Sequence, residues 1–508
     1  MIDRARALVA ESSVYKRPVD VEREIERIHR YSRIIEAFDL SHFSSLCNPG
    51  IKFFTHHYCH ARAASALSPF RTALILVMDG CGNAASAFGP EHPEIKGFPA
   101  GGDIFETCTA YLLEEGRLEC VDKQWHFIEN WGSPNVISEG LGWFYDLAAR
   151  YIFNSRVDCG KVMGLAPFGS AERVSDQKRY FERLGWGRAF QGHGKTEWEA
   201  SSSFRFYADV AASVQAHFTQ AYLAIVRGLK ERFPKIENLV LTGGCALNCA
   251  ANMKVIESRL FSSVYVPPFP GDESIGFGAA QALRLDVLKI PWAPLSWEEQ
   301  VPNFGPNRSV PSRAAAIKLF QGRKVRVLKN VPAAVAKLLR EGKVVGWFQG
   351  RSESGPRALG FRSVLADPTK RGMKDYLNER IKGREKFRPY GCTVLWEKSH
   401  DYFDVPEGFE SPFMSFAPRV RGGYGDLLRE ITHVDGTSRI QTLRRGQNPL
   451  FYALIEEFGR MSGVACLLNT SMNVMGEPIV ETLEDARRFF ENCPVAAIVA
   501  EDVLVSRS

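Results

Sequence analysis

Three histidines within five residues are the first candidates for chemistry in this chain of 508 residues. The segment 55–67, THHYCHARAASAL, is rich in helix formers, and on a helix His56 and His60 share one face. Two imidazoles at this spacing can bind one divalent metal ion. His57 and His60, three residues apart, form an alternative pair, and partly exposed capping or core histidines are the alternative without a metal. The spacing alone leaves these interpretations open.

Two aspartates could complete such a metal site. Asp79 ends the apolar run TALILVMDG at 72–80, which is typical of a buried strand that delivers a carboxylate to a loop. Asp272 follows a glycine in PPFPGDESIGFGAAQAL at 267–283, and becomes a fourth ligand if this turn folds back toward the histidines. The alternative for Asp272 is an ordinary helix N-cap.

Basic residues gather with Ser, Thr, Asn and Gly in the second part of the chain. The segments are GRSESGPRALGFRSVLADP at 350–368, IKGREKFRPYG at 381–391, HVDGTSRIQTL at 433–443 and LLNTSMNVMGEPIV at 467–480. Guanidinium groups donate hydrogen bonds in pairs to oxyanions, so converging arginines make a phosphate or carboxylate receptor. A solvated helix face would instead pair Lys with Glu four residues apart. We therefore predict an anion site here.

Two glycine-rich segments of the first part are weaker signals. In GGCALN at 243–248, Gly243 and Gly244 follow a β-branched run and would let backbone N–H groups approach a phosphate, although paired glycines also form plain turns. In DCGKVMGLAPFG at 158–169, Lys161 follows a glycine, but the GxxxxGK[ST] pattern is absent, which excludes a P-loop.

The elements that must position these residues are strands alternating with helical stretches, which predicts an α/β (or α+β) fold. Prolines at 291, 294, 302, 306 and 311 interrupt regular structure between two such regions. We predict a first domain at 1–290, a Pro-rich linker region at 291–325 and a second domain at 326–508.

Composition excludes several classes of protein. The balance of 64 Lys and Arg against 58 Asp and Glu, with 45% hydrophobic residues, is that of a globular protein and not of a disordered chain. Residues 351–388 contain eleven Lys and Arg and five Asp and Glu, so the excess charge lies in the predicted anion site. This favours a small phosphorylated substrate over nucleic acid or membrane. The 11 scattered cysteines, the short apolar runs and the polar N-terminus predict a soluble, cytoplasmic protein.

Nine motifs, in order and from about residue 50 onward, together resemble the ATP-dependent O-carbamoyltransferases of antibiotic and nodulation-factor biosynthesis. They are HHYCHARAASA, MDGCGN, GKVMGLAPFG, LTGGCALN, PPFPGDESIGFGAA, GPRALGFRS, IKGREKFRPYG, HVDGTSRIQT and NTSMNVMGEPIVETLEDA. The resemblance implies an ASKHA-type, Kae-like N-terminal domain followed by a smaller YrdC-like α/β domain. The second domain would make carbamoyl adenylate from carbamoyl phosphate and ATP with Mg²⁺. The first would transfer the carbamoyl group to a hydroxyl of a small-molecule acceptor with the help of Fe²⁺ or another divalent metal.

The resemblance also assigns residues to roles. The implied metal ligands are His56, His60, Asp79 and Asp272. The implied catalytic residues around carbamoyl phosphate and ATP are Arg357, Lys382, Arg388, Arg439 and Ser471. The implied cofactor-binding residues are Gly243, Gly244, Asn248 and Asn469. The resemblance thus favours His56 over His57 as the partner of His60, and it implies neither a nucleic-acid nor a membrane partner.

The N-terminus departs from the family pattern. No His-Asp motif precedes residue 50, and AESSVYKRPVD at 10–20 places Lys16 and Arg17 at the family's basic positions. We therefore expect either that the start of the chain is assigned too late or that an N-terminal strand and part of the acceptor site are missing. A missing strand would affect acceptor transfer more than adenylate formation. Two alternatives follow: a binding or scaffold protein descended from such an enzyme, and a threonylcarbamoyl-type tRNA-modifying enzyme. The sequence shows no basic RNA-binding tract to favour the latter.

Overall fold

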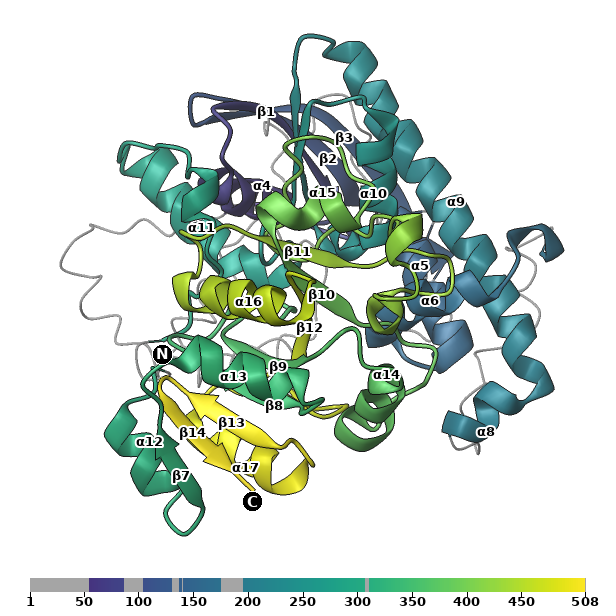
Figure 1. Cartoon of the computed structure of the whole chain (residues 1–508). Helices are drawn as coiled ribbons and strands as arrows, with labels where there is room; N and C mark the ends of the chain where they lie inside the picture. Colours follow the sequence, from purple (N-terminus) through teal and green to yellow (C-terminus); the bar gives the residue numbers. More distant parts are fainter. Residues whose placement is uncertain are drawn as a thin grey trace, which may run out of the picture.

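A computed structural model describes residues 54–85, 104–129, 137–138, 140–174, 195–306 and 310–507. The N-terminal segment on which we expect a missing strand lies outside these ranges, so that expectation stays a prediction. Figure 1 shows two regions of sheet and helix that follow one another along the chain.

The first sheet has six strands in the order β4-β3-β2-β1-β5-β6. Their bounds are β1 Thr72–Met78, β2 Ile104–Glu114, β3 Arg117–Glu129, β4 Ile137–Ser138, β5 Asn238–Thr242 and β6 Ser263–Tyr265. The apolar run that the sequence marks as a strand is β1, buried along almost its whole length because sheet and helices cover both its faces. It pairs antiparallel with β2 and parallel with β5, so the chain leaves β1 and β5 at the same edge. That edge brings Asp79 close to Gly244.

Helices cover this sheet and complete the first part. They are α4 His56–Leu67, α5 Leu141–Phe153, α6 Cys159–Leu165, α8 Lys195–Ala200, α9 Ser202–Arg232, α10 Cys249–Ser258 and α11 Ile275–Ala282. The predicted histidine helix is α4, and it packs against α11. Their contact is close because Gly278 of α11 faces the backbone of Cys59, where a Cβ atom would stand 1.9 Å from the carbonyl oxygen.

The second sheet has eight strands in the order β11-β10-β12-β9-β8-β13-β14-β7. Their bounds are β7 Lys324–Val327, β8 Val345–Phe348, β9 Arg362–Ala366, β10 Gly391–Leu395, β11 Ile440–Leu443, β12 Cys466–Ser471, β13 Ala497–Ala500 and β14 Val503–Ser506. The longer helices are α12 Arg313–Leu319, α13 Val331–Arg340, α16 Pro449–Ser462 and α17 Leu483–Asn492, with single turns at α14 Met373–Tyr376 and α15 Ser399–Tyr402. Helices α13 and α16 lie side by side on one face (Figure 1), where Leu339, Phe451 and Trp347 share a buried cluster.

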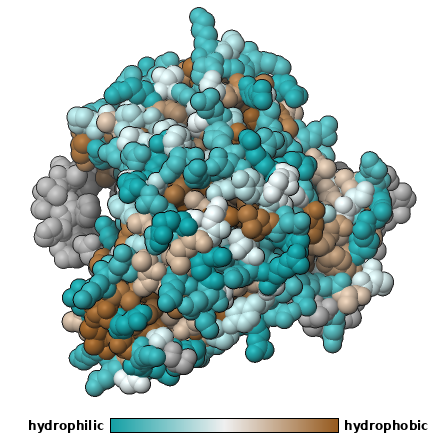
Figure 2. All heavy atoms as spheres, viewed as in Figure 1, coloured by the Kyte–Doolittle hydropathy of each residue, from teal (hydrophilic) through white to brown (hydrophobic). Residues whose placement is uncertain are grey.

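Two sheets that each mix parallel and antiparallel pairs confirm the α/β fold class. The predicted Pro-rich region contains α12 and leads into β7, the edge strand of the second sheet; the domain boundaries stay a prediction. Hydrophilic residues cover most of the face in Figure 2, with an apolar area near α12 and β7. The stretch of chain from 310 to 327 has three exposed apolar residues, Val310, Ile317 and Val327. None of the helices in the described ranges has the length and apolar character of a membrane-spanning segment.

Candidate metal cluster and anion cavity

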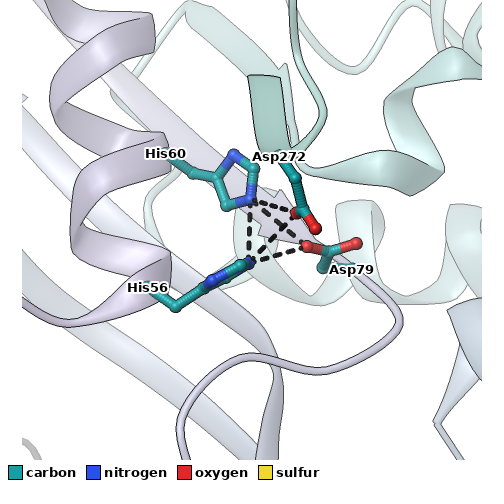
Figure 3. Close-up of side chains that lie close together, drawn as sticks. All are labelled: His56, His60, Asp79 and Asp272. Atoms are coloured by element: carbon teal, nitrogen blue, oxygen red, sulfur yellow. Dashed lines mark hydrogen bonds and ion pairs between the residues drawn. The ribbon is translucent and has the colours of Figure 1, made fainter. Parts of the chain in front are cut away.

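Four predicted side chains converge at the edge of the first sheet (Figure 3). The Nε2 atoms of His56 and His60 lie 3.2 Å apart. Asp79 Oδ2 lies 3.1 Å from the first and 3.2 Å from the second, and Asp272 Oδ1 lies 3.3 and 3.6 Å from them. The four ligand atoms all lie within 4.8 Å of one another. We call these four residues the metal cluster.

Neighbouring groups aim the ligand atoms of the metal cluster. His60 Nδ1 lies 3.0 Å from Ser274 Oγ in the 3₁₀ turn η7, Asp272–Ser274. When Nδ1 carries the proton and donates to Ser274, Nε2 keeps its lone pair directed at the cluster. Asp79 Oδ1 accepts hydrogen bonds from the backbone N–H groups of Gly80 and Gly244, at 2.8 and 3.2 Å, which leaves Oδ2 facing the histidines.

The charges of the metal cluster compensate one another. Burial lowers the pKa of His56, but hydrogen bonds to Asp272 and Asp79 outweigh burial and raise it to about 10. Burial raises the pKa of Asp79, yet the two histidines hold that pKa well below its usual value. Hydrogen bonds from His56 and His60 lower the pKa of Asp272 to about 2. Without a metal ion, protonated imidazoles therefore neutralise the carboxylates.

His57, the alternative ligand, lies outside the metal cluster. Its Nδ1 lies 2.7 Å from Thr109 Oγ1, and burial lowers its pKa to about 4. Its backbone N–H donates to Glu106 Oε1, at 3.3 Å, which also accepts from the backbone N–H of Asn83 at 3.0 Å. Lys123 forms an ion pair with the same buried carboxylate. Glu106 therefore ties the start of α4 to the loop that follows Asp79.

The metal cluster fits a divalent cation. Nitrogen and oxygen donors about 2.0–2.2 Å from one cation stand roughly 3 to 3.6 Å apart, as the Nε2 and carboxylate oxygen atoms do here. Two carboxylates and two neutral imidazoles match a charge of +2, and this donor set suits Fe²⁺, Zn²⁺ or Mn²⁺. The Nε2 lone pairs of His56 and His60 point toward each other and repel unless a proton or a metal ion lies between them.

A cavity of about 770 Å³ lies between the two parts of the chain. The first part contributes residues of α6, α9 and the start of α10, and the second contributes loops and strand ends. Of the predicted residues, the cavity is lined by Arg357, Arg388, Arg439, Asn469 and Ser471. The structure thus gathers in one place side chains that lie more than a hundred residues apart in the sequence.

The cavity carries an excess of positive charge. Its charged lining residues are Lys254, Arg357, Arg384, Arg388, Arg439 and Asp435. Arg388 lies 3.7 Å from Glu385. Among the described residues, no carboxylate forms an ion pair with Arg357 or Arg439, and Arg439 Nε is buried without a hydrogen-bond partner. Burial, followed by the charge of Arg357, lowers the pKa of Arg439 to about 9, and burial also lowers that of Arg357. Half-buried cations without carboxylate partners indicate an anion site.

Lys382 lies beneath the cavity wall and contacts Ser471, which lines it. Its ammonium group donates to Ser471 Oγ at 3.1 Å, and to the backbone oxygen and Oδ1 of Asn473 at 2.9 and 2.7 Å. Burial, with the nearby Arg384 and Arg388, lowers its pKa well below the usual value. Lys382 therefore holds the end of β12 in place.

The residues predicted to hold the adenylate already bond within the protein. Gly243 N–H donates to Pro270 O at 2.8 Å, and Gly243 has φ 83°, a left-handed conformation that favours glycine. Asn248 exchanges side-chain hydrogen bonds with Gln215, at 3.1 and 3.2 Å, and caps α10 through Ala251 N–H. Nucleotide binding by these residues stays a prediction.

Some residues that line the cavity escape sequence reasoning. Three of these residues lie within the basic motifs at 381–391 and 433–443, namely Tyr390, His433 and Ser438. The sequence therefore indicates their segments as part of an anion site but does not single out the residues. Gln215 and Thr219, one turn apart on α9, also line it. Nothing in the α9 sequence marks them, because only the contact between the two parts of the chain makes them neighbours of the arginines.

The two-sheet α/β fold thus holds a candidate metal cluster and a cationic cavity. The Carbamoyltransferase N-terminus family matches residues 25–281, and the Carbamoyltransferase C-terminus family matches residues 336–507. The chain belongs to the carbamoyltransferase family.

Three curated relatives support this placement. Nodulation protein NolNO of Sinorhizobium fredii is 32% identical over 90% of this chain, which spans 64% of the length of that relative. Nodulation protein NolO of Bradyrhizobium diazoefficiens is 32% identical, and the match covers 89% of this chain and 78% of the length of NolO. The 3'-hydroxymethylcephem-O-carbamoyltransferase of Amycolatopsis lactamdurans is 32% identical over 69% of this chain and 65% of its own.

Proposed function

We propose that this chain is an O-carbamoyltransferase that makes carbamoyl adenylate from carbamoyl phosphate and ATP and transfers the carbamoyl group to a hydroxyl of a small molecule. The observation that carries the proposal is the cavity, where the half-buried Arg357 and Arg439 form no ion pair with a carboxylate of the described residues and so suit phosphate oxygens. The name of the Amycolatopsis relative, which gives a hydroxymethyl group as the acceptor, favours a hydroxyl acceptor here.

The first half-reaction takes place in the cavity. Water cleaves carbamoyl phosphate to carbamate and inorganic phosphate. A carbamate oxygen then bonds to the α-phosphorus of ATP, whose bond to pyrophosphate breaks, and carbamoyl adenylate forms. Arg357, Arg388 and Arg439 hold phosphate oxygens and stabilise the charge that develops on them, while Mg²⁺ accompanies ATP as part of the co-substrate.

The second half-reaction takes place at the metal cluster. The acceptor hydroxyl oxygen bonds to the carbamoyl carbon, the bond to the adenylate oxygen breaks, AMP departs, and the hydroxyl proton is released to solvent. A divalent cation, which we propose to be Fe²⁺, would be held by His56, His60, Asp79 and Asp272 and would supply Lewis acidity for the transfer.

One short segment connects the two places. Gly244 donates its N–H to Asp79 of the metal cluster, and Cys249, five residues further on, lines the cavity. The intervening turn η6, Gly244–Leu247, and Asn248 therefore connect the cavity, where the adenylate would form, with the metal cluster, where the carbamoyl group would be transferred. This supports transfer of the adenylate within one protein.

The test is pyrophosphate release by the full chain with Fe²⁺, Mg²⁺ and ATP. We expect release to require carbamoyl phosphate, with bicarbonate plus threonine unable to replace it. Addition of a 3'-hydroxymethylcephem as the acceptor probe should produce AMP and a carbamoylated product detectable by mass spectrometry. Absence of pyrophosphate release at saturating carbamoyl phosphate would overturn the proposal at its first step.

A further inference from the structure

A buried chain of hydrogen bonds crosses three neighbouring strands beside the cavity. Gln441 of β11 lies opposite Thr393 of β10, and Asn469 lies on β12, which pairs with the other side of β10. Thr393, Asn469 and Gln441 are 0%, 1% and 3% exposed. Asn469 lines the cavity; Thr393 and Gln441 do not.

Two backbone carbonyls fix the direction of every hydrogen bond in this chain. Gln441 Nε2 donates to Leu359 O at 3.2 Å, so its Oε1 faces Thr393 and accepts the hydroxyl proton at 2.7 Å. The Thr393 hydroxyl, having donated to Gln441, accepts from Asn469 Nδ2 at 2.9 Å. The second Nδ2 proton goes to Ala358 O at 3.2 Å. Carbonyl oxygens only accept hydrogen bonds. If the oxygen and nitrogen of either side-chain amide exchanged places, the amide oxygen would face a backbone carbonyl oxygen and no hydrogen bond could form.

The result is an unsatisfied acceptor beside a cluster of cations. Asn469 Oδ1 is buried without a hydrogen-bond partner, while Arg357, on the loop that contains Ala358, faces the same cavity. Phosphate oxygens cannot satisfy Oδ1, because they too are acceptors. Only a ligand with an N–H or O–H group can.

We infer that Thr393 and Gln441 are positioning residues that hold Asn469 Oδ1 ready for the NH₂ group of the carbamoyl donor. This inference rests on the proposed function, since it names the part of carbamoyl phosphate that Asn469 recognises. Acetyl phosphate has a methyl group in place of that NH₂ and leaves Oδ1 unpaired. The chain of hydrogen bonds therefore selects carbamoyl phosphate over acetyl phosphate.

The experiment compares the two acyl phosphates on the full chain. Calorimetric titration without ATP gives both dissociation constants, and pyrophosphate release gives the KM for carbamoyl phosphate and the inhibition constant of acetyl phosphate. We expect the wild-type chain to bind carbamoyl phosphate roughly 10- to 100-fold more tightly, because an unpaired buried acceptor disfavours the analogue. Thr393→Val should lower the affinity for carbamoyl phosphate roughly 3- to 10-fold and leave the affinity for acetyl phosphate unchanged.

Three further variants keep the inference open to refutation. Thr393→Ser retains the hydroxyl and should restore the preference. Gln441→Met removes the acceptor of the Thr393 proton and should weaken the binding of carbamoyl phosphate alone, as expected for Thr393→Val. It therefore provides the test if Thr393→Val fails to fold. Thr442→Val is the matched control, because Thr442, next to Gln441 on β11, is equally buried and accepts from Ser411 N–H outside this chain of hydrogen bonds.

The outcomes separate this inference from the proposed function. Equal affinities of the wild-type chain for both acyl phosphates, or equal weakening of both by Thr393→Val, would overturn it. A rise in the KM for ATP alone would assign Oδ1 to the adenine amino group and would also overturn it. A preference for carbamoyl phosphate without any pyrophosphate release would leave the inference standing and refute the proposed function.

Discussion

The metal cluster and the anion cavity handle charge in opposite ways. In the metal cluster, two imidazoles face two carboxylates at 3.1–3.6 Å, and each carboxylate favours the protonated imidazoles while each imidazole favours the ionised carboxylates. In the cavity, Arg357 and Arg439 are half-buried near each other with no carboxylate partner in the described part of the chain, and their pKa values fall. The charges of the metal cluster are balanced within the protein, whereas the lining of the cavity keeps an excess of positive charge among the described residues.

The two regions also differ in where they lie. The metal cluster belongs entirely to the first part of the chain, with α4 and the turns after β1 and before α11 as its supports. The cavity needs both parts, because α9 faces the arginines of the second part. A difference in stability and in ligand dependence should follow, and variants of each region can test it.

The largest expected effect concerns Arg439. Arg439→Met removes a half-buried cation, and we expect pyrophosphate release to fall roughly 100- to 1000-fold in kcat/KM because a donor to developing phosphate charge is lost. The same variant should raise the Tm of the free protein. The folded-state pKa of Arg439, about 9, lies below its usual value, so its charge destabilises the folded chain at every pH below 9.

The control for this variant is Arg460→Met on α16, where Arg460 is exposed and pairs with Glu457. It should change neither activity nor Tm measurably. Inorganic phosphate should raise the Tm of the wild-type chain and have a weaker effect on Arg439→Met. A lower Tm in Arg439→Met, with the phosphate effect intact, would contradict the description of the cavity as charge-unbalanced.

The next effect concerns Asp79. Asp79→Asn keeps an oxygen for the Gly80 and Gly244 N–H groups but removes a charged ligand, so we expect Fe²⁺ affinity to fall roughly 100-fold or more. Carbamoyl transfer should fall with it, while pyrophosphate release stays within about threefold of wild type, because Asp79 is not a cavity residue. Calorimetric metal titration measures the first effect and product analysis the second.

The matched control is Asp426→Asn, since Asp426 is an exposed aspartate paired with Arg429. It should retain wild-type metal affinity. Equal loss of pyrophosphate release and transfer in Asp79→Asn would show that the two regions do not act as separate sites.

The same contrast explains how much the sequence could predict. The metal cluster follows local rules: helical spacing puts His56 and His60 on one face, and a buried strand delivers Asp79. Spacing could not exclude His57, because only the tertiary contact of its ring with Thr109 shows that the ring lies outside the metal cluster. The basic motifs predicted the arginines of the cavity, but not Gln215 or Thr219, whose role depends on how two distant segments pack. Nor could the sequence show that Lys382 supports the wall from beneath.

The smallest effect tests how the metal cluster is held in shape. Ser274→Ala removes the partner of His60 Nδ1 without touching any ligand atom, so the imidazole loses its preference for the form with a free Nε2. We expect Fe²⁺ affinity to fall about 10-fold, with pyrophosphate release unchanged, and Ser274→Thr, which retains a hydroxyl, to recover part of the loss. Ser274 is fully buried, so a shared drop in Tm would indicate packing and not ligand orientation. Metal titration at a temperature where wild type and variant have the same folded fraction separates the two explanations. A loss of Fe²⁺ affinity caused by imidazole orientation persists under these conditions, whereas a loss caused by a packing defect does not.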